Sequence, residues 1–310
     1  MLFRSSSFCG VVGLKPSTGR IPQSRALQPD IFSQLAPYPH YGPHARNVKD
    51  AAFMLEIMAG PHSRDPFTLP DDGTEFVKAT QREIVGKSIA YSPDLGLFPV
   101  SKEVRSVVED SIEIFEAMGA DINYITPNFN YSREELINVY ELWSEVLLAT
   151  RASNVKQRLG VDILGEDRDK LSSTLIEYIE AADNVDIMDY KQTGILRTNV
   201  FDTVQNIFNS YDLLVTPTVA VPPFDISLSL GPDEVDGEDV HPHVGWSLTW
   251  VFNMTDHPAA SIPAGLNSDG LPIGLQIVGP RFADDEVIAA SAAFERGRPW
   301  EHIYPPDLVE

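Results

Sequence analysis

The chain has 310 residues, with 23 Lys or Arg against 45 Asp or Glu, so its formal net charge at pH 7 is −22. A surface this acidic repels phosphate backbones and anionic lipid headgroups, which argues against nucleic acid and membrane partners. The single cysteine, Cys9, excludes an internal disulfide framework and a cysteine-rich metal site, and it is typical of a reducing, cytoplasmic setting.

The first patterned stretch is the apolar run Phe8–Leu14, which is too short for a signal peptide or a membrane helix. Its two glycines favour a close backbone approach, so the run is predicted to be a buried strand or a close-packed turn. Pro and Gly in the following segment, Lys15–Arg20, predict a turn, and its sequence does not match a phosphate-binding loop. We expect Lys15 to hold this turn.

The next elements are marked by local signals. Residues 22–43 are Pro-rich and irregular, and Asn47 is a good N-cap for a helix over Val48–Met58. Farther on, a strand over Lys87–Tyr91, a helix that starts after Ser101, and a strand over Asp121–Ile125 follow one another. A strand-helix-strand unit of this length predicts a right-handed crossover between two parallel strands.

The middle of the chain, from about residue 128 to 211, is predicted to be mostly helical. Ser132–Glu135 has the sequence of a capping box, which marks a helix start. Leu171–Ala182 and the apolar positions between Ile195 and Phe208 indicate two further helices. A buried strand then runs over Leu213–Thr218.

The segment Asp225–His243 is rich in carboxylates and contains His241 and His243. It lacks the ligand spacing of a calcium loop, and two histidines without a third ligand are weak evidence for zinc. We therefore expect a solvated loop and no metal site.

The end of the chain predicts a hairpin followed by a helix. Asp269-Gly270 is a tight-turn sequence between the strands Ala259–Pro263 and Ile273–Val278. Asp284 or Asp285 is expected to cap the last helix.

Two longer motifs carry a family resemblance. The run from Phe8 to Pro22 and the run from Phe252 to Gly265 resemble segments of the amidase signature family, the amide hydrolases with a Ser-cisSer-Lys triad. Asp256 stands where that family commonly has glycine. The resemblance extends from Phe8 to the C-terminus. It implies an α/β fold with a mixed, largely parallel sheet flanked by helices on both faces, in a single domain over residues 1–310 that is incomplete at its N-terminal strands.

The resemblance also bears on catalysis. Counting back from Phe8-Cys9-Gly10 puts Met1 on or next to the nucleophile position, so we transfer no catalytic residue to this chain. Ser5, Ser6 and Ser7 align better with the positions that follow the nucleophile. The implied parent reaction is the hydrolysis of a carbon–nitrogen amide bond without metal or cofactor. We expect this chain to be inactive alone, because triad members act as a unit.

For substrate binding, the resemblance points to the Pro22–His40 loop and to Trp246, Phe252 and Asn253 as walls of one pocket for a small-molecule amide. Oligomeric state and the identity of the amide stay open. Two alternatives remain: the glutamine-amidotransferase subunit of the same family, and an inactive fragment or pseudoenzyme. The amidotransferase subunits carry a Phe-Ala-Ser-Ser-Leu-Asp-Gln-like stretch that residues 26–40 lack, which favours a stand-alone amidase.

Overall fold

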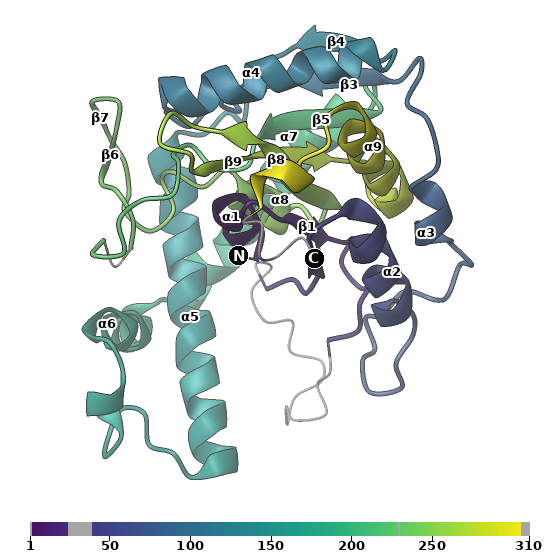
Figure 1. Cartoon of the computed structure of the whole chain (residues 1–310). Helices are drawn as coiled ribbons and strands as arrows, with labels where there is room; N and C mark the ends of the chain where they lie inside the picture. Colours follow the sequence, from purple (N-terminus) through teal and green to yellow (C-terminus); the bar gives the residue numbers. More distant parts are fainter. Residues whose placement is uncertain (1, 24–38, 229, 305–310) are drawn as a thin grey trace.

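The computed structural model describes residues 2–23, 39–228 and 230–304 (Figure 1). Its strands are β1 (Val12–Lys15), β2 (His44–Ala45), β3 (Ser88–Tyr91), β4 (Asp121–Tyr124), β5 (Leu213–Pro217), β6 (Glu234–Val235), β7 (Glu238–Asp239), β8 (Ala259–Leu266) and β9 (Pro272–Val278). Seven of these form one sheet in the order β2-β1-β8-β9-β5-β3-β4, and β6 pairs with β7 in a separate hairpin.

The sheet is mixed, as expected, and its two halves differ. At one end β3 pairs in parallel with β4 and with β5. The pairs β1–β2, β1–β8, β8–β9 and β5–β9 are antiparallel. The expectation of a largely parallel sheet therefore describes only the β4-β3-β5 end. In the antiparallel half, β8 and β9 are joined by a short turn, and a strand that returns through a hairpin must run against its neighbour.

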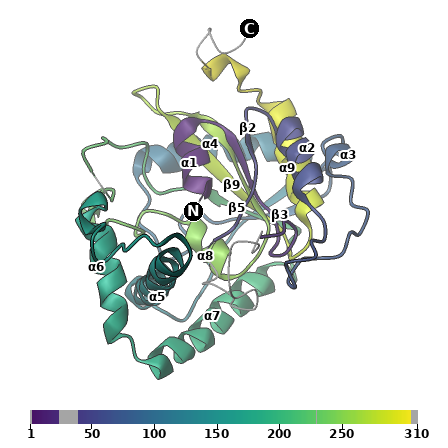
Figure 2. The ribbon, with the colours of Figure 1, turned by 90° about the horizontal axis from the view of Figure 1, so that it is seen from below.

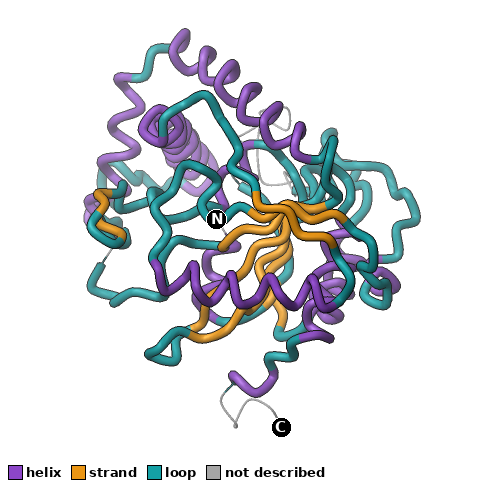
Figure 3. The backbone as a smooth tube through the Cα atoms, turned by 90° about the horizontal axis from the view of Figure 1, so that it is seen from above, coloured by secondary structure: helices purple, strands orange, loops and turns teal. Residues whose placement is uncertain are grey.

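Helices lie on both faces of the sheet. The α-helices are α1 (Leu2–Cys9), α2 (Val48–Met58), α3 (Phe76–Ala79), α4 (Lys102–Ala117), α5 (Arg133–Leu159), α6 (Ser173–Ala181), α7 (Ile187–Ile207), α8 (Thr249–Met254) and α9 (Asp284–Gly297). Figure 2 shows α2 and α9 on one side of the sheet and α1, α8 and α7 on the other. Figure 3 shows the strands of the main sheet side by side with helices around them, and the short β6-β7 hairpin apart from them. In Figure 1, α5 and α6 extend away from the sheet.

Three helices begin directly after the capping residues that the sequence predicts. Asn47 caps α2 by accepting a hydrogen bond from the backbone of Asp50. Ser101 caps α4 in the same way, and Ser132 with Glu135 forms the predicted capping box of α5. These caps satisfy backbone N–H groups that have no partner inside the helix. The predicted strand-helix-strand unit is β3-α4-β4, and its strands are parallel.

Two local expectations are wrong. Phe8 belongs to helix α1, so only Val12–Leu14 of the expected strand Phe8–Leu14 is extended, and the strand continues to Lys15. Asp284 does not cap α9, whose N-cap is Ala283 without a side-chain hydrogen bond. The Asp284 carboxylate instead accepts a hydrogen bond from the backbone N–H of Ser17 at 2.7 Å. Both errors arise because tertiary contacts override the local pattern.

Candidate functional site

Helix α1 is seated on the sheet where β1 and β9 carry glycine. A Cβ added to Gly13 would lie 2.0 Å from Ser6 Oγ, and one added to Gly274 would lie 2.5 Å from Ser7 Oγ. Ser6 and Ser7 are buried in this contact. Neither glycine position leaves room for a side chain, so the two glycines set the distance between α1 and the sheet.

Ser6 forms a pair with a histidine from the edge strand β2. Its Oγ lies 2.8 Å from His44 Nδ1. Burial lowers the pKa of His44, which keeps the imidazole neutral at neutral pH. A serine within hydrogen-bond reach of a neutral histidine has the geometry of a nucleophile with its base. However, Ser6 has 0% of its surface exposed, so an amide cannot approach it.

The two neighbouring serines lack a base. Ser7 is buried, and its Oγ has no hydrogen-bond partner among the described residues. Ser5 is exposed, and within residues 2–23, 39–228 and 230–304 no hydrogen bond joins it to a basic side chain. None of the three serines combines access for a substrate with a group that can take its proton.

Lys15 at the end of β1 is a buried amine. Its Nζ is fully enclosed and has no hydrogen-bond partner among the described residues. Burial lowers the pKa of Lys15 to about 8, although the charges of Asp256 and Asp284 act in the opposite direction. Lys15 is expected to hold the turn, and among the described residues its ammonium makes no hydrogen bond that would do so. An amine with this pKa suits proton transfer, but no serine Oγ in the described part of the chain bonds to it.

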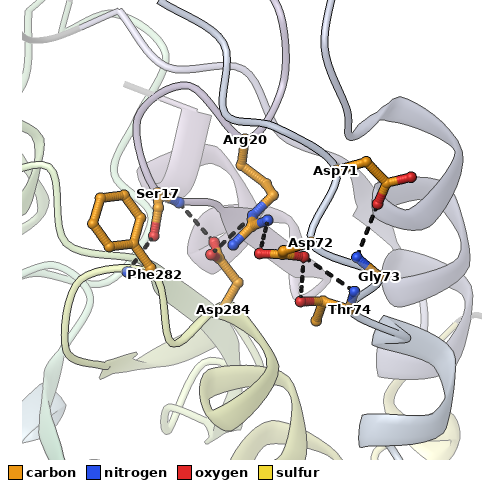
Figure 4. Close-up of polar contacts among 8 residues, drawn as sticks. All are labelled: Ser17, Arg20, Asp71, Asp72, Gly73, Thr74, Phe282 and Asp284. Carbon is orange, nitrogen blue, oxygen red and sulfur yellow. Dashed lines mark hydrogen bonds and ion pairs between the residues drawn. The ribbon is translucent and has the colours of Figure 1, made fainter.

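The turn after β1 is fixed by a network of carboxylates (Figure 4). Asp284 accepts hydrogen bonds from the Ser17 backbone and from Arg20 Nε, the latter at 3.3 Å. Arg20 Nη1 donates to Asp72 at 2.7 Å, and Asp72 also accepts from Thr74. The hydrogen bond from the Thr74 hydroxyl, followed by that from Arg20, lowers the pKa of Asp72 to about 2. The segment before α3 is thereby tied to the turn and to the first residue of α9.

Asp256 follows α8 and makes a second polar network. Its Oδ1 accepts a hydrogen bond from Thr18 Oγ1 at 2.6 Å and lies 3.4 Å from His40 Nε2, while its Oδ2 lies 2.8 Å from Arg197 Nη2. Burial alone would raise the pKa of Asp256. Hydrogen bonds from His40 and Thr18 and the charge of Arg197 outweigh burial and bring that pKa down to about 2.

The next residue, His257, is fully buried. Burial, followed by the charge of Lys15, lowers the pKa of His257 to about 3, so the ring is neutral. Its Nδ1 pairs with Thr255 Oγ1 at 2.9 Å and its Nε2 with Gln205 Oε1 at 3.3 Å. Both ring nitrogens are therefore engaged in structural contacts.

The expected substrate wall lies in the protein interior. Trp246, Phe252 and Asn253 have exposed fractions of 1%, 0% and 3%. The Trp246 ring stacks on Phe8 of α1 with centroids 5.7 Å apart, and the Arg4 guanidinium lies 5.5 Å from its centroid. Phe252 and Asn253 belong to α8. Most of the Pro22–His40 loop lies outside the described residues, so a shared pocket stays a prediction.

The acidic segment that ends at His243 is held by pairwise contacts. His241 Nε2 lies 2.9 Å from Glu141 Oε1, and His243 Nδ1 lies 3.2 Å from the hydroxyl of Tyr178. Within the described part of the chain, no three His, Cys, Asp or Glu side chains converge as a metal site would require. The described helices also include none that is long and apolar enough to cross a membrane.

Sequence reasoning missed the Ser6–His44 pair and the partners of Asp256. Ser6 and His44 are 38 positions apart, and no local pattern links them. For Asp256 there was a signal. An aspartate at a position where the resembled family has glycine indicates a left-handed backbone, and its φ is 60°.

Comparison with known proteins gives consistent results. A family model described as Amidase matches residues 6–288. An acylamidase of Rhodococcus erythropolis is 34% identical over 307 residues, which are 98% of this chain and 61% of the relative. A glutamyl-tRNA(Gln) amidotransferase subunit of Clostridium botulinum is 26% identical over 97% of this chain and 62% of its own length. The chain thus spans about 60% of these curated relatives.

A solved structure agrees with the sequence comparison. A bacterial aryl acylamidase of the amidase signature enzymes superposes with a TM-score of 0.88 at 33% identity, covering 96% of this chain and 60% of that protein. The sheet and the helices on its two faces are therefore shared with that enzyme.

Proposed function

This chain belongs to the amidase family, and from that we propose that its parent reaction is the hydrolysis of a carbon–nitrogen amide bond of a small molecule by a serine nucleophile. The observation that carries the proposal is the match to an acylamidase along 98% of the chain at 34% identity. The TM-score of 0.88 to an aryl acylamidase supports the same conclusion. An aryl or acyl amide is accordingly the first substrate class to test.

In this proposal the reaction uses neither metal nor cofactor. Amide hydrolysis needs a nucleophile, a group that moves its proton, and donors that stabilise the oxyanion. The family supplies the first two with two serines and a lysine. The acidic surface supports a small-molecule substrate rather than nucleic acid or membrane. A cytoplasmic location remains part of the proposal, and the oligomeric state is left open.

We assign three of the described residues to the wall of the substrate pocket and the others to the scaffold. Trp246, Phe252 and Asn253 combine aromatic surface with an amide group, which suits a pocket for an apolar amide. All three are buried in the described structure, so the proposal requires that the pocket open for an amide to reach them. Trp246 supports the assignment by packing against Phe8 of α1, the helix that follows the nucleophile position in the resembled family. Substitution of Asn253 by alanine, with Tm measured beside KM to separate folding from substrate binding, checks this wall.

We further propose that the 310-residue chain alone hydrolyses no amide and that its nucleophile position is not supplied by Ser5, Ser6 or Ser7. The support comes from the described surroundings of these serines. Ser6 is buried against His44, Ser7 is buried without a hydrogen-bond partner among the described residues, and Ser5 is exposed without a base there. A fragment or a pseudoenzyme is consistent with the same surroundings.

The second candidate function is that of a glutamine-dependent amidotransferase component. It rests on relatives at about a quarter identity, among them the Clostridium botulinum protein at 26%. The acylamidase match is stronger, and residues 26–40 lack the stretch typical of the amidotransferase subunits. Glutamine therefore belongs in the substrate panel, and its selective hydrolysis would favour this second function.

The test uses the 310-residue chain and a hybrid in which this chain replaces the matched part of the Rhodococcus erythropolis acylamidase. Both are assayed on aryl anilides, aliphatic amides and glutamine, with the intact acylamidase as control. If the hybrid does not fold, the chain and the unmatched remainder of the acylamidase are co-expressed as separate polypeptides. We expect turnover from the hybrid or the reassembled pair, none from the chain alone, and no loss of rate after dialysis against EDTA.

Two outcomes contradict the proposal. A hybrid that melts cooperatively yet hydrolyses nothing in the panel rejects the amidase function of this scaffold. Turnover by the 310-residue chain that disappears in a Ser5→Ala, Ser6→Ala or Ser7→Ala variant rejects the assignment of the nucleophile.

A further inference from the structure

Asp256 joins three segments that are far apart in the sequence. Its carboxylate accepts a hydrogen bond from Thr18 in the turn after β1, lies beside His40, and pairs with Arg197 of α7. The separations along the chain are 238 residues to Thr18 and 59 residues to Arg197. The antiparallel pairing of Lys15 in β1 with Ala259 in β8 brings the turn after β1 close to Asp256, and α7 packs against α8. Within this arrangement the Asp256 carboxylate links the segments directly.

The backbone at Asp256 is in a conformation that favours glycine. Its φ is 60°, in the left-handed region that most residues avoid because Cβ approaches the carbonyl oxygen. Aspartate is one of the few side chains that tolerate this region. The resembled family commonly has glycine here, and glycine would adopt the same φ without strain. The hydrogen bonds of the Asp256 carboxylate with Thr18 and Arg197 offset the strain of this backbone conformation.

Arg197 extends the contact to α8 and α5. Its Nε donates to the carbonyl oxygen of Met254, the last residue of α8, at 2.6 Å. Its guanidinium also lies 5.6 Å from the ring centroid of Trp143 in α5. Arg197 therefore connects the C-terminal carbonyl of α8 to the Asp256 carboxylate.

We propose that Asp256 is a positioning residue, which acts through Arg197 to fix α8 relative to the turn after β1. The inference rests on the proposed function, because α8 carries Phe252 and Asn253 of the proposed substrate wall. Lining residues that are held in one place bind a substrate better than residues that must be ordered on binding. Loss of the pair should therefore weaken substrate binding more than it slows the chemical step.

The experiment is a double-mutant cycle in the hybrid enzyme described above. The variants are Asp256→Asn, Arg197→Gln and the two combined. Asn tolerates the same backbone region, so Asp256→Asn removes the charge without changing the backbone preference. We expect each single variant to raise KM at least about fivefold with kcat within about twofold of the parent. The double variant should raise KM by less than the product of the two single effects, because both substitutions remove the Asp256–Arg197 pair.

A matched control comes from Asp236, which also has a left-handed backbone, with φ 49°. It lies in the turn between β6 and β7, and its carboxylate accepts a hydrogen bond from the backbone of Lys102. Asp236→Asn should leave KM unchanged. Asp256→Gly, which relieves the backbone but removes the carboxylate, should raise KM like Asp256→Asn.

Three results overturn the inference: KM increases that multiply in the double variant, lower Tm with unchanged KM in both single variants, or an Asp256→Gly variant that binds substrate as the parent does. If the hybrid melts cooperatively but has no turnover, the proposed function fails. The interaction between Asp256 and Arg197 is then tested by measuring Tm for the same three variants of the 310-residue chain. Additive Tm shifts reject the interaction, and non-additive shifts support it.

Discussion

At the scale of single residues, Lys15 is an amine buried in the protein interior. A buried ammonium without a hydrogen-bond partner among the described residues is costly, and the structure compensates only through the more distant charges of Asp256 and Asp284. Because burial lowers the pKa of Lys15 from 10.5 to about 8, the folded protein binds that proton less tightly than the unfolded chain. Lys15 therefore destabilises the fold wherever it is charged.

The first prediction is that Lys15→Met raises the free energy of unfolding at pH 7 by up to about 3 kcal/mol, since one pKa unit corresponds to about 1.4 kcal/mol. Between pH 8 and 10.5 the unfolded chain holds more protons than the folded protein, so the stability of the parent rises with pH in this window. The advantage of the variant should shrink over the same window. Urea unfolding of the parent and the variant at pH 7, 9 and 10.5 measures this difference in the free energy of unfolding.

The parent protein itself is the control in this comparison, because all other groups that titrate in the window are common to both chains. A variant that is less stable than the parent at pH 7, or an advantage that does not depend on pH, would show that the Lys15 ammonium has a partner that stabilises it.

At the scale of elements, the seating of α1 on the sheet depends on the two glycines beneath it. The Cβ of an alanine at position 274 would lie 2.5 Å from Ser7 Oγ and 3.0 Å from the Ser7 Cα. The obstacle includes backbone as well as side chain, so a rotamer change cannot relieve it. α1 would have to move away from β9, and the contact between Phe8 and Trp246 would open with it.

The second prediction is that Gly274→Ala lowers the free energy of unfolding by about 1–3 kcal/mol, the usual cost of overpacking. Gly194→Ala is the matched control. Gly194 is exposed within α7, and nothing lies within 4 Å of its added Cβ, so alanine should stabilise by about 0.5–1 kcal/mol through helix propensity. Thermal melts of the two variants should move Tm in opposite directions. Equal shifts would mean that α1 does not rest on Gly274.

At the scale of the whole molecule, the net charge of −22 acts on every part of the surface. Like charges repel one another more when the chain is compact, which lowers the stability of the folded state. Dissolved salt screens this repulsion over about 10 Å at 0.1 M. Ion pairs such as Arg197–Asp256 leave the net charge unchanged, because 45 acidic residues outnumber 23 basic ones by 22.

The third prediction is that Tm rises by several degrees between 20 mM and 300 mM NaCl at pH 7.5. Differential scanning calorimetry at a series of NaCl concentrations checks it, and the same series with a neutral osmolyte separates charge screening from solvent effects. A fall in Tm with added salt would indicate that specific ion pairs, rather than net repulsion, dominate the electrostatics.

Local sequence signals determined much of the fold. The caps at Asn47, Ser101 and Ser132 placed three helix starts, because a capping side chain acts on backbone groups two or three residues away. The Asp269-Gly270 turn predicted that β8 and β9 pair as a hairpin. The resemblance of two motifs indicated the family, which the comparisons confirm.

The tertiary structure alone decided which side chains meet. Ser6 and His44, Ser17 and Asp284, and Thr18 and Asp256 are 38, 267 and 238 residues apart. The Asp284 carboxylate does not cap α9, because it accepts hydrogen bonds from the backbone N–H of Ser17 and from the guanidinium of Arg20, which are distant in the sequence. Propensities describe the free energy of a residue with its neighbours along the chain. The polar networks of this molecule depend on charge and burial between distant segments, which are set only once the sheet has brought those segments together.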